Sequence, residues 1–306
     1  MNRSKSLYAP RHWPTWFAVG GLRAAVTLLP WSWNLALGRA LGRLAFRLAG
    51  KRVRIARRNL ERCFPECSRD EREALLRRHF ASLGMALFET GLAWWTGPAR
   101  LARHLEVAGR EHLDAALDSE QGVILVVAHA TLVELGGRFI AAQLGDRPRA
   151  LMYRPADDPV LERMLVRRRR AAMGELIARD DARDMVRRLR RGEVVWYASD
   201  QNYGGPHSVF APFFGILAAT NPGISRLARL GRARLLFANI RRVDDRGRYL
   251  LRFEPGPVKF PGASPRQDAE MINRAIERWV REAPEQYLWI HRRFKTRPEG
   301  EPPFYD

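Results

Sequence analysis

His129 and Glu134 form the pair of residues in this sequence that is best suited to proton transfer. The imidazole of histidine titrates near neutral pH, so it can take a proton from an alcohol as that alcohol attacks a thioester. The chain has seven histidines and 33 acidic residues, so this spacing is common by chance and location must decide. Only His129 ends an apolar run and directly precedes a helical pattern. His129 is therefore the candidate general base.

Glu134 has two interpretations. Thr131 and Glu134 have the spacing of a capping box, in which the glutamate binds a backbone N–H at the start of a helix. Two helical residues five positions apart differ by about 140 degrees around the axis, so His129 must lie in the turn before the helix. The residues alone leave three possible roles for Glu134, and more than one of them can hold. It caps the helix, it orients or stabilises the imidazolium, or it lies near the substrate.

Strand and helix patterns alternate along the chain. Apolar runs predict buried strands over 123–127 and 194–198, and further extended segments are expected over 150–153, 234–240 and 249–253. Helical spacing and caps predict helices over 69–95, 131–144, 158–172, 180–190, 221–230 and 267–282. This order indicates an α/β fold with a mixed, mainly parallel sheet covered by helices on both faces.

Polar clusters follow three of the expected strands. They are His129 with Glu134, then Arg154, then the loop that contains Asp200 and Tyr203. In open sheets of this class the ligand site lies beyond the carboxyl ends of the strands, so we expect these clusters to converge. Arg154 is interpreted as a surface arginine or as a guanidinium that binds a phosphate or an oxyanion. Asp200 orients a polar network or holds its loop.

The N-terminal region predicts association with a membrane. The run 14–33 approaches the roughly 20 apolar residues that a spanning helix needs, although Arg23 lies within it. Tryptophans bracket this run and arginines follow it, which places the rest of the chain on the cytoplasmic side. We predict a membrane anchor or embedded helix over 1–45 and a catalytic domain over 46–306. A buried amphipathic helix in a globular core is the alternative.

Charge and cysteine content narrow the classes of partner. The formal net charge of +20 favours anionic partners, namely nucleic acid, a phospholipid surface or a phosphorylated substrate. Cys63 and Cys67 are too few for a disulfide framework and lack a second ligand pair for zinc. Neither a glycine-rich phosphate loop nor a cluster of metal ligands is found, so no metal or cofactor is expected.

Several ordered motifs resemble the late acyltransferases of lipid A biosynthesis, most closely the lauroyltransferase type. They are RNLERCFPE, LGMALFETGLAWW, GVILVVAHATLVELGGR, YRPADDPVLE, RRGEVVWYASDQNYG, SVFAPFFGILAAT and APEQYLWIHRRFKTRPEG. The resemblance implies that His129 is the base and Glu134 its partner, within the broader glycerolipid acyltransferase superfamily. Arg154, Asp200 and Tyr203 match later blocks of the family, which contribute to the acceptor site.

The resemblance also implies the partners and the cellular location. The acyl donor would be acyl carrier protein and the acceptor a Kdo-modified, tetra-acylated lipid A precursor, at the cytoplasmic face of the bacterial inner membrane and in contact with its phospholipid. Two alternatives are an acyltransferase with another glycolipid or a lysophospholipid as acceptor, and a nonenzymatic basic protein that binds membranes or nucleic acid. Nucleic acid is not expected as a partner, because no nucleic-acid-binding motif is recognised.

Overall fold

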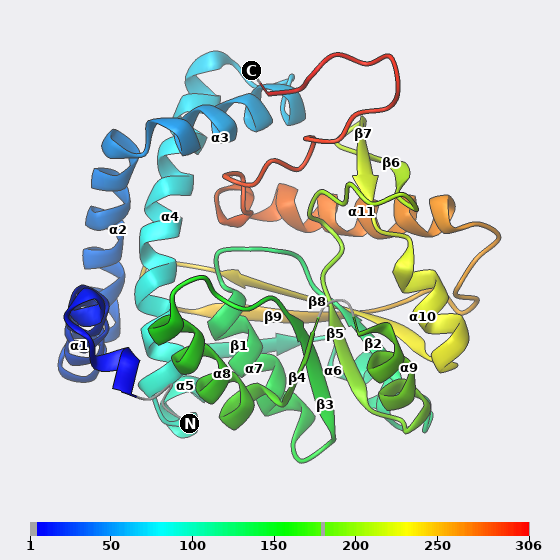
Figure 1. The fold of residues 1–306 in the computed structure, drawn as a ribbon, viewed down its shortest axis with the longest axis horizontal. Coiled ribbons are helices and arrows are strands. Elements are labelled where there is room, and N and C mark those ends of the chain that lie inside the picture. The colour runs from blue at the N-terminus through cyan, green and yellow to red at the C-terminus, as the bar shows by residue number, and fades with distance from the viewer. Residues whose placement is uncertain (1–4, 179–180, 306) are drawn as a thin grey trace.

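A seven-stranded sheet forms the centre of the computed structural model, which describes residues 5–178 and 181–305 (Figure 1). The strand order is β1-β9-β8-β2-β5-β3-β4. β8 and β9 are antiparallel, and all other neighbours are parallel. The strands are β1 (Leu105–Ala108), β2 (Val123–Val126), β3 (Arg149–Tyr153), β4 (Glu175–Ala178), β5 (Val194–Tyr197), β8 (Arg234–Arg242) and β9 (Tyr249–Pro255), with a separate hairpin of β6 (Val209–Phe213) and β7 (Ile216–Thr220). The expected mixed, mainly parallel sheet is confirmed.

Helices pack around this sheet (Figure 1). The α-helices of the described residues are α1 (Trp13–Leu28), α2 (Trp31–Leu48), α3 (Gly50–Cys63), α4 (Arg69–Trp95), α5 (Pro98–Ala102), α6 (Arg110–Leu117), α7 (Val133–Leu144), α8 (Pro159–Met173), α9 (Ala182–Arg190), α10 (Gly223–Gly231) and α11 (Pro265–Glu282). Short 3-10 turns occupy Lys5–Tyr8, Pro10–His12 and Pro284–Gln286. Ser68 and Glu71 form a capping box at the start of α4, where a helix was predicted from residue 69.

Alternating residues of the central strands build two apolar cores, one on each face of the sheet. In β2, Ile124 and Val126 pack with buried residues of α3, α9, α10 and α11. Val123 and Leu125 pack with buried residues of α6, α7 and α8. All four side chains are at most 1% exposed, so this strand is enclosed on both sides. Its rigid end is where the chain reaches His129.

Other predicted elements need correction. α7 begins at Val133 with Leu132 as its N-cap and without a side-chain cap, so the predicted capping box of Thr131 and Glu134 is not formed. The hydroxyl of Thr131 instead lies 3.0 Å from that of Ser82 on α4. The sequence patterns did not predict β1, β4, or the β6–β7 hairpin. Asp180, where the predicted helix over 180–190 begins, lies outside the described residues.

The apolar run 14–33 is interrupted rather than continuous. Leu29, which precedes Pro30, has extended backbone angles (φ −93°, ψ 151°), so α1 ends before it and α2 begins after it. Within the described residues, no helix combines the length and apolarity needed to cross a membrane. The division into 1–45 and 46–306 stays a prediction, and its boundary falls inside α2.

α2 and α4 approach each other closely enough for their backbones to touch. A Cβ added to Gly38 would lie 2.8 Å from the carbonyl oxygen of Gly84, and one added to Gly42 would collide with the carbonyl of Phe80. Glycine is required at these crossings because any side chain would separate the helices. α2 is consequently fixed directly to the long helix α4, beside which it runs in Figure 1.

Candidate active site

His129 and Asp200 form a hydrogen-bonded pair at the carboxyl end of the sheet. The Nδ1 atom of His129 lies 2.6 Å from Oδ1 of Asp200, and the backbone N–H of His129 donates to Oδ2 at 2.9 Å. The Asp200 side chain is fully buried, whereas that of His129 is 29% exposed. Nε2 of His129 makes no hydrogen bond within the part of the chain that the structure describes. The carboxylate of Asp200 thus fixes both the backbone and the ring of His129 and leaves Nε2 available to a substrate.

Strand pairing brings the two residues together. β2 and β5 are parallel neighbours, and Val126 lies opposite Tyr197 in their register. Each strand is followed after the same interval by one member of the pair, so His129 and Asp200 emerge side by side although 71 positions separate them. The expected convergence of these two clusters is confirmed.

Asp200 controls the protonation of His129. Burial by itself would lower the pKa of His129, but the charge of Asp200 and its hydrogen bond outweigh this effect, so the pKa of His129 is raised. Burial would likewise raise the pKa of Asp200, but the charge of His129 and the hydrogen bonds from its ring and backbone N–H lower it. The carboxylate therefore stays ionised and favours the imidazolium form of its partner.

The C-terminal segment supports this pair from behind. Tyr287 forms an antiparallel bridge with Ala130 and donates its hydroxyl hydrogen to the carbonyl of Asp200 at 3.3 Å. Arg293 is buried and donates to the carbonyl of Ala219 and to the hydroxyl of Thr220, both at 2.7 Å, and to the carbonyl of Gln201 at 3.1 Å. It thereby ties the loop after β5 to β7.

Residues near His129 in this segment were missed by sequence reasoning. Arg293 is only 2% exposed. Burial lowers the pKa of His291 to about 4, and this ring also senses the charges of Asp200 and His129. The usable signal was the apolar run 287–290, which directly precedes His291.

Glu134 does not contact the imidazole of His129. It is buried, and its Oε1 accepts from Nε of Arg169 on α8 at 2.9 Å while its Oε2 accepts from Nε1 of Trp94 on α4 at 3.1 Å. The carboxylate of Glu134 is thus hydrogen-bonded to a guanidinium and an indole, and the role of Glu134 as the partner of His129 stays a prediction. Glu134 joins α7 to α8 and α4.

Arg154 and Tyr203 lie in different surroundings. The side chain of Arg154 is 71% exposed, and its nearest carboxylate is that of Asp157, at 3.8 Å. Tyr203 lines a large groove between α9 and α10, and its N–H donates to the carbonyl of Ala219 at 3.1 Å. The structure thus places Tyr203 on the loop of Asp200 and leaves Arg154 on the surface after β3.

A largely apolar pocket of about 70 Å³ is lined by the two chain neighbours of His129 but not by His129 itself. Ala128 and Ala130 flank the histidine and line the pocket, which continues between α7 and the sheet to Met173 and Trp196. On the wall formed by α7, the Met173 side chain packs directly against Gly137, because a Cβ there would lie 2.7 Å from the sulfur of Met173. The pocket is suited to an aliphatic chain.

Metal ligands do not gather at this site. Over 5–178 and 181–305, no group of three or more His, Cys, Asp or Glu side chains has an arrangement that would hold an ion. Cys63 and Cys67 are free thiols, and burial strongly raises the pKa of Cys63.

Comparison with known proteins identifies the family of this chain. A model of the bacterial lipid A biosynthesis acyltransferases matches residues 1–296. The chain is 40% identical to the lipid A biosynthesis lauroyltransferase of Escherichia coli (strain K12), over 99% of this chain and 98% of that protein. It is also 40% identical to the palmitoleoyltransferase of the same strain (99% and 97% covered) and 31% identical to its myristoyltransferase (97% and 91%). The chain therefore belongs to the bacterial lipid A biosynthesis acyltransferase family.

Proposed function

We propose that this protein transfers a fatty acyl group from acyl carrier protein to a hydroxyl of an acyl chain on a Kdo-modified, tetra-acylated lipid A precursor. Membership in the family supports lipid A as the acceptor class. The observation that carries the chemistry is the pairing of His129 with a buried carboxylate at the end of the central strands. This pair supplies a general base for the attacking alcohol. The acyl group therefore passes directly from donor to acceptor, without an acyl-enzyme intermediate.

The mechanism begins at the free Nε2 of His129. Because Nδ1 is held by Asp200, Nε2 faces the acceptor and takes the proton of its hydroxyl. The oxygen attacks the thioester carbonyl and forms a tetrahedral oxyanion. When this intermediate collapses, the C–S bond breaks and the leaving thiolate receives the proton from the imidazolium. Asp200 stabilises the imidazolium between these two proton transfers.

Two neighbouring features serve the rest of the reaction. The first N–H groups of α7 lack partners within the helix, so they are available to bind the oxyanion, as helix N-termini do for anions. The apolar pocket that starts at Ala128 and Ala130 accepts the first part of an acyl chain. We assign Glu134 a positioning role, because with Arg169 it lines this pocket and holds α7 in place.

The proposed reaction is tested with purified protein, a series of acyl carrier protein thioesters and the tetra-acylated Kdo-bearing acceptor. Mass spectrometry should show one added acyl group, and its mass identifies the preferred chain. The His129→Ala variant should lose this product because the base is removed. A wild-type enzyme that acylates only a lysophospholipid, or a variant that stays active, would contradict the proposal.

We further propose that α1 and α2 lie in the membrane interface, with the active site on the cytoplasmic side. Large apolar side chains on these helices face outward, with 42 to 80% of their surface exposed: Trp13, Phe17, Leu28, Trp33, Leu37, Leu41, Leu44 and Leu48. On α2 they recur every three or four residues and so share one face. Arg47 is the arginine of α2 nearest to this face and suits anionic headgroups, whereas Arg39 is paired with Asp245 at 2.6 Å.

Replacement of Leu44 by glutamate should weaken binding to anionic phospholipid vesicles about tenfold, because each methylene group withdrawn from the bilayer costs roughly 0.8 kcal/mol. Co-flotation with vesicles measures the effect. The matched control is Val258→Glu, a change at an exposed apolar residue outside α1 and α2. Equal flotation of the two variants would exclude this face as the membrane contact.

A further inference from the structure

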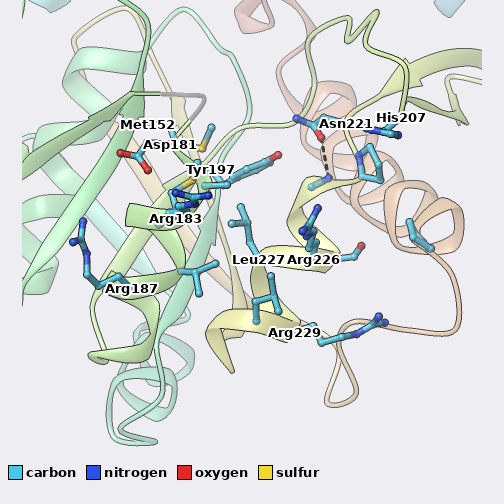
Figure 2. A pocket seen from close by; sticks show the side chains of 18 of the residues that line it. Met152, Asp181, Arg183, Arg187, Tyr197, His207, Asn221, Arg226, Leu227 and Arg229 are labelled. Atoms are coloured by element: carbon cyan, nitrogen blue, oxygen red, sulfur yellow. Dashed lines mark hydrogen bonds between the residues drawn. The ribbon is translucent and has the colours of Figure 1, made fainter.

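A groove of about 1350 Å³ between α9 and α10 has no assigned role in the proposed reaction. Figure 2 shows it with Arg183 and Arg187 from α9 on one side and Arg226 and Arg229 from α10 on the other. Tyr197, at the end of β5, lies at its inner end. The groove is therefore next to the strand that leads to Asp200.

The walls of the groove are strongly cationic. Among the described residues, six arginines line it, at positions 183, 187, 190, 191, 226 and 229, against one lining carboxylate, that of Asp181. Asp181 is already used as the N-cap of α9, where it accepts from the N–H of Asp184 at 2.9 Å. Among the residues that the structure describes, Arg191, Arg226 and Arg229 have no carboxylate partner. This excess of positive charge favours an anionic ligand.

Only some of these arginines make contacts that stabilise the fold. α9 and α10 are anchored by apolar residues, among them Met185, Leu189 and Leu227, which pack into the core below. Arg190 connects the two helices by donating to the carbonyl of Leu230 at 2.8 Å, and Arg187 binds Asp184 at 2.5 Å. Arg191, Arg226 and Arg229 have no carboxylate partner among the described residues, so an anionic partner outside the chain would neutralise them.

The chemistry of the groove selects an amphipathic partner. Met152, Val186, Leu227 and Leu230 line it together with the arginines, so apolar and cationic surfaces alternate. A helix with acidic residues around an apolar stripe complements both surfaces, in the manner of a helix bound in a groove. A free phosphate or a nucleotide would leave the apolar residues without a contact.

The location of the groove favours a protein that approaches from water over a lipid headgroup. Figure 1 is drawn with the longest axis horizontal, and it shows α1 and α2 at one end of this axis and α9 and α10 at the other. If the exposed face of α1 and α2 contacts the bilayer, the groove lies at the far end of the molecule. A headgroup held in that bilayer does not reach it.

We propose that the groove docks an acidic helix of the acyl carrier protein that delivers the donor thioester, an inference that rests on the proposed function. One loop connects the groove to the reacting residues. Tyr197 and Tyr203 line the groove, and Asp200 lies between them and binds His129. The thioester arm of a docked carrier would enter along this loop, opposite to the lipid acceptor.

The test uses the full-length double variant Arg191→Glu/Arg226→Glu, which reverses one charge on each side of the groove. Its Kd for fluorescently labelled acyl carrier protein should rise about 10- to 30-fold, because attraction is replaced by repulsion at two positions. The control Arg103→Glu/Arg274→Glu changes the net charge equally at exposed arginines outside the groove and should bind like the wild type.

Kinetics with two donors make the result specific. With the carrier-bound donor, kcat/KM of the groove variant should fall about as much as binding does. With a carrier-free acyl pantetheine thioester it should stay within about twofold of the wild type. Unchanged carrier binding, or an equal loss with both donors, would overturn the proposal. Binding is measured without acceptor, so a wild type that binds the carrier but transfers no acyl group refutes the proposed function and leaves docking intact.

Discussion

Replacement of Asp200 by asparagine is expected to lower kcat by about 10³- to 10⁴-fold, the scale on which a catalytic histidine depends on the acid that orients it. The carboxylate accepts from both the ring and the backbone of His129, and it stabilises the positive charge that the ring gains during the reaction. An asparagine of the same shape supplies no such charge. The rate of acyl transfer under saturating donor and acceptor measures the loss.

The pH profile separates this role from a merely structural one. The general base must be neutral, so activity of the wild type should fall as pH drops through the pKa of His129, which Asp200 raises above 6.5. In Asp200→Asn the charge is gone while burial remains, so the acid limb of kcat/KM should move to lower pH. Glu134→Gln is the matched control, because Glu134 binds Arg169 and Trp94 and should leave the limb in place. A limb that moves in the control instead would assign Glu134 as the partner.

Replacement of Glu89 by alanine is expected to lower the free energy of unfolding by about 3 to 5 kcal/mol, because it leaves a buried guanidinium unpaired. Glu89 is 1% exposed and accepts from Arg242 at 2.7 and 2.8 Å and from the hydroxyl of Tyr249 at 2.7 Å. These contacts join α4 to β8 and β9. Urea denaturation measures the change.

A second variant distinguishes the effect of the unpaired charge from the effect of lost packing. Glu89→Leu combined with Arg242→Met removes both charges and keeps apolar volume, so it should recover most of the stability lost in Glu89→Ala. If the double variant is no more stable than the single one, the unpaired charge is not the cause. If Glu89→Ala loses less than about 1 kcal/mol, water reaches Arg242 and the pair is not enclosed.

Periodicity and caps were sufficient to predict the central elements from the sequence. Local sequence patterns predict where α4 begins and ends, and they predict the strands that precede His129 and Asp200. Tertiary packing stabilises the same elements. The partner of His129 did not follow, since the choice between Glu134 and Asp200 depends on which strands are neighbours. Arg169, which donates a hydrogen bond to Glu134, lies on another helix 35 positions later in the chain. No local sequence pattern predicts this contact.

The N-terminal run shows a different limit. Hydropathy treats 14–33 as one apolar segment, but Pro30 forces an extended residue before it and separates two helices. The hairpin of β6 and β7 was missed because its strands contain proline and phenylalanine in an apolar stretch without clear alternation. Burial of Phe213 and Phe214 in the core, rather than a local preference, fixes that segment.

The glycine contact between α2 and α4 couples the exposed face of α2 to the loop that bears the imidazole. α4 carries Ser82, whose hydroxyl meets that of Thr131 only two residues beyond His129. The exposed apolar face of α2 and this loop are therefore connected through α4, which meets α2 by bare backbone at Gly42 and Gly84. If that face contacts the bilayer as proposed, this packing sets the height of the imidazole above the leaflet, and the acceptor chain must rise to that height to be acylated.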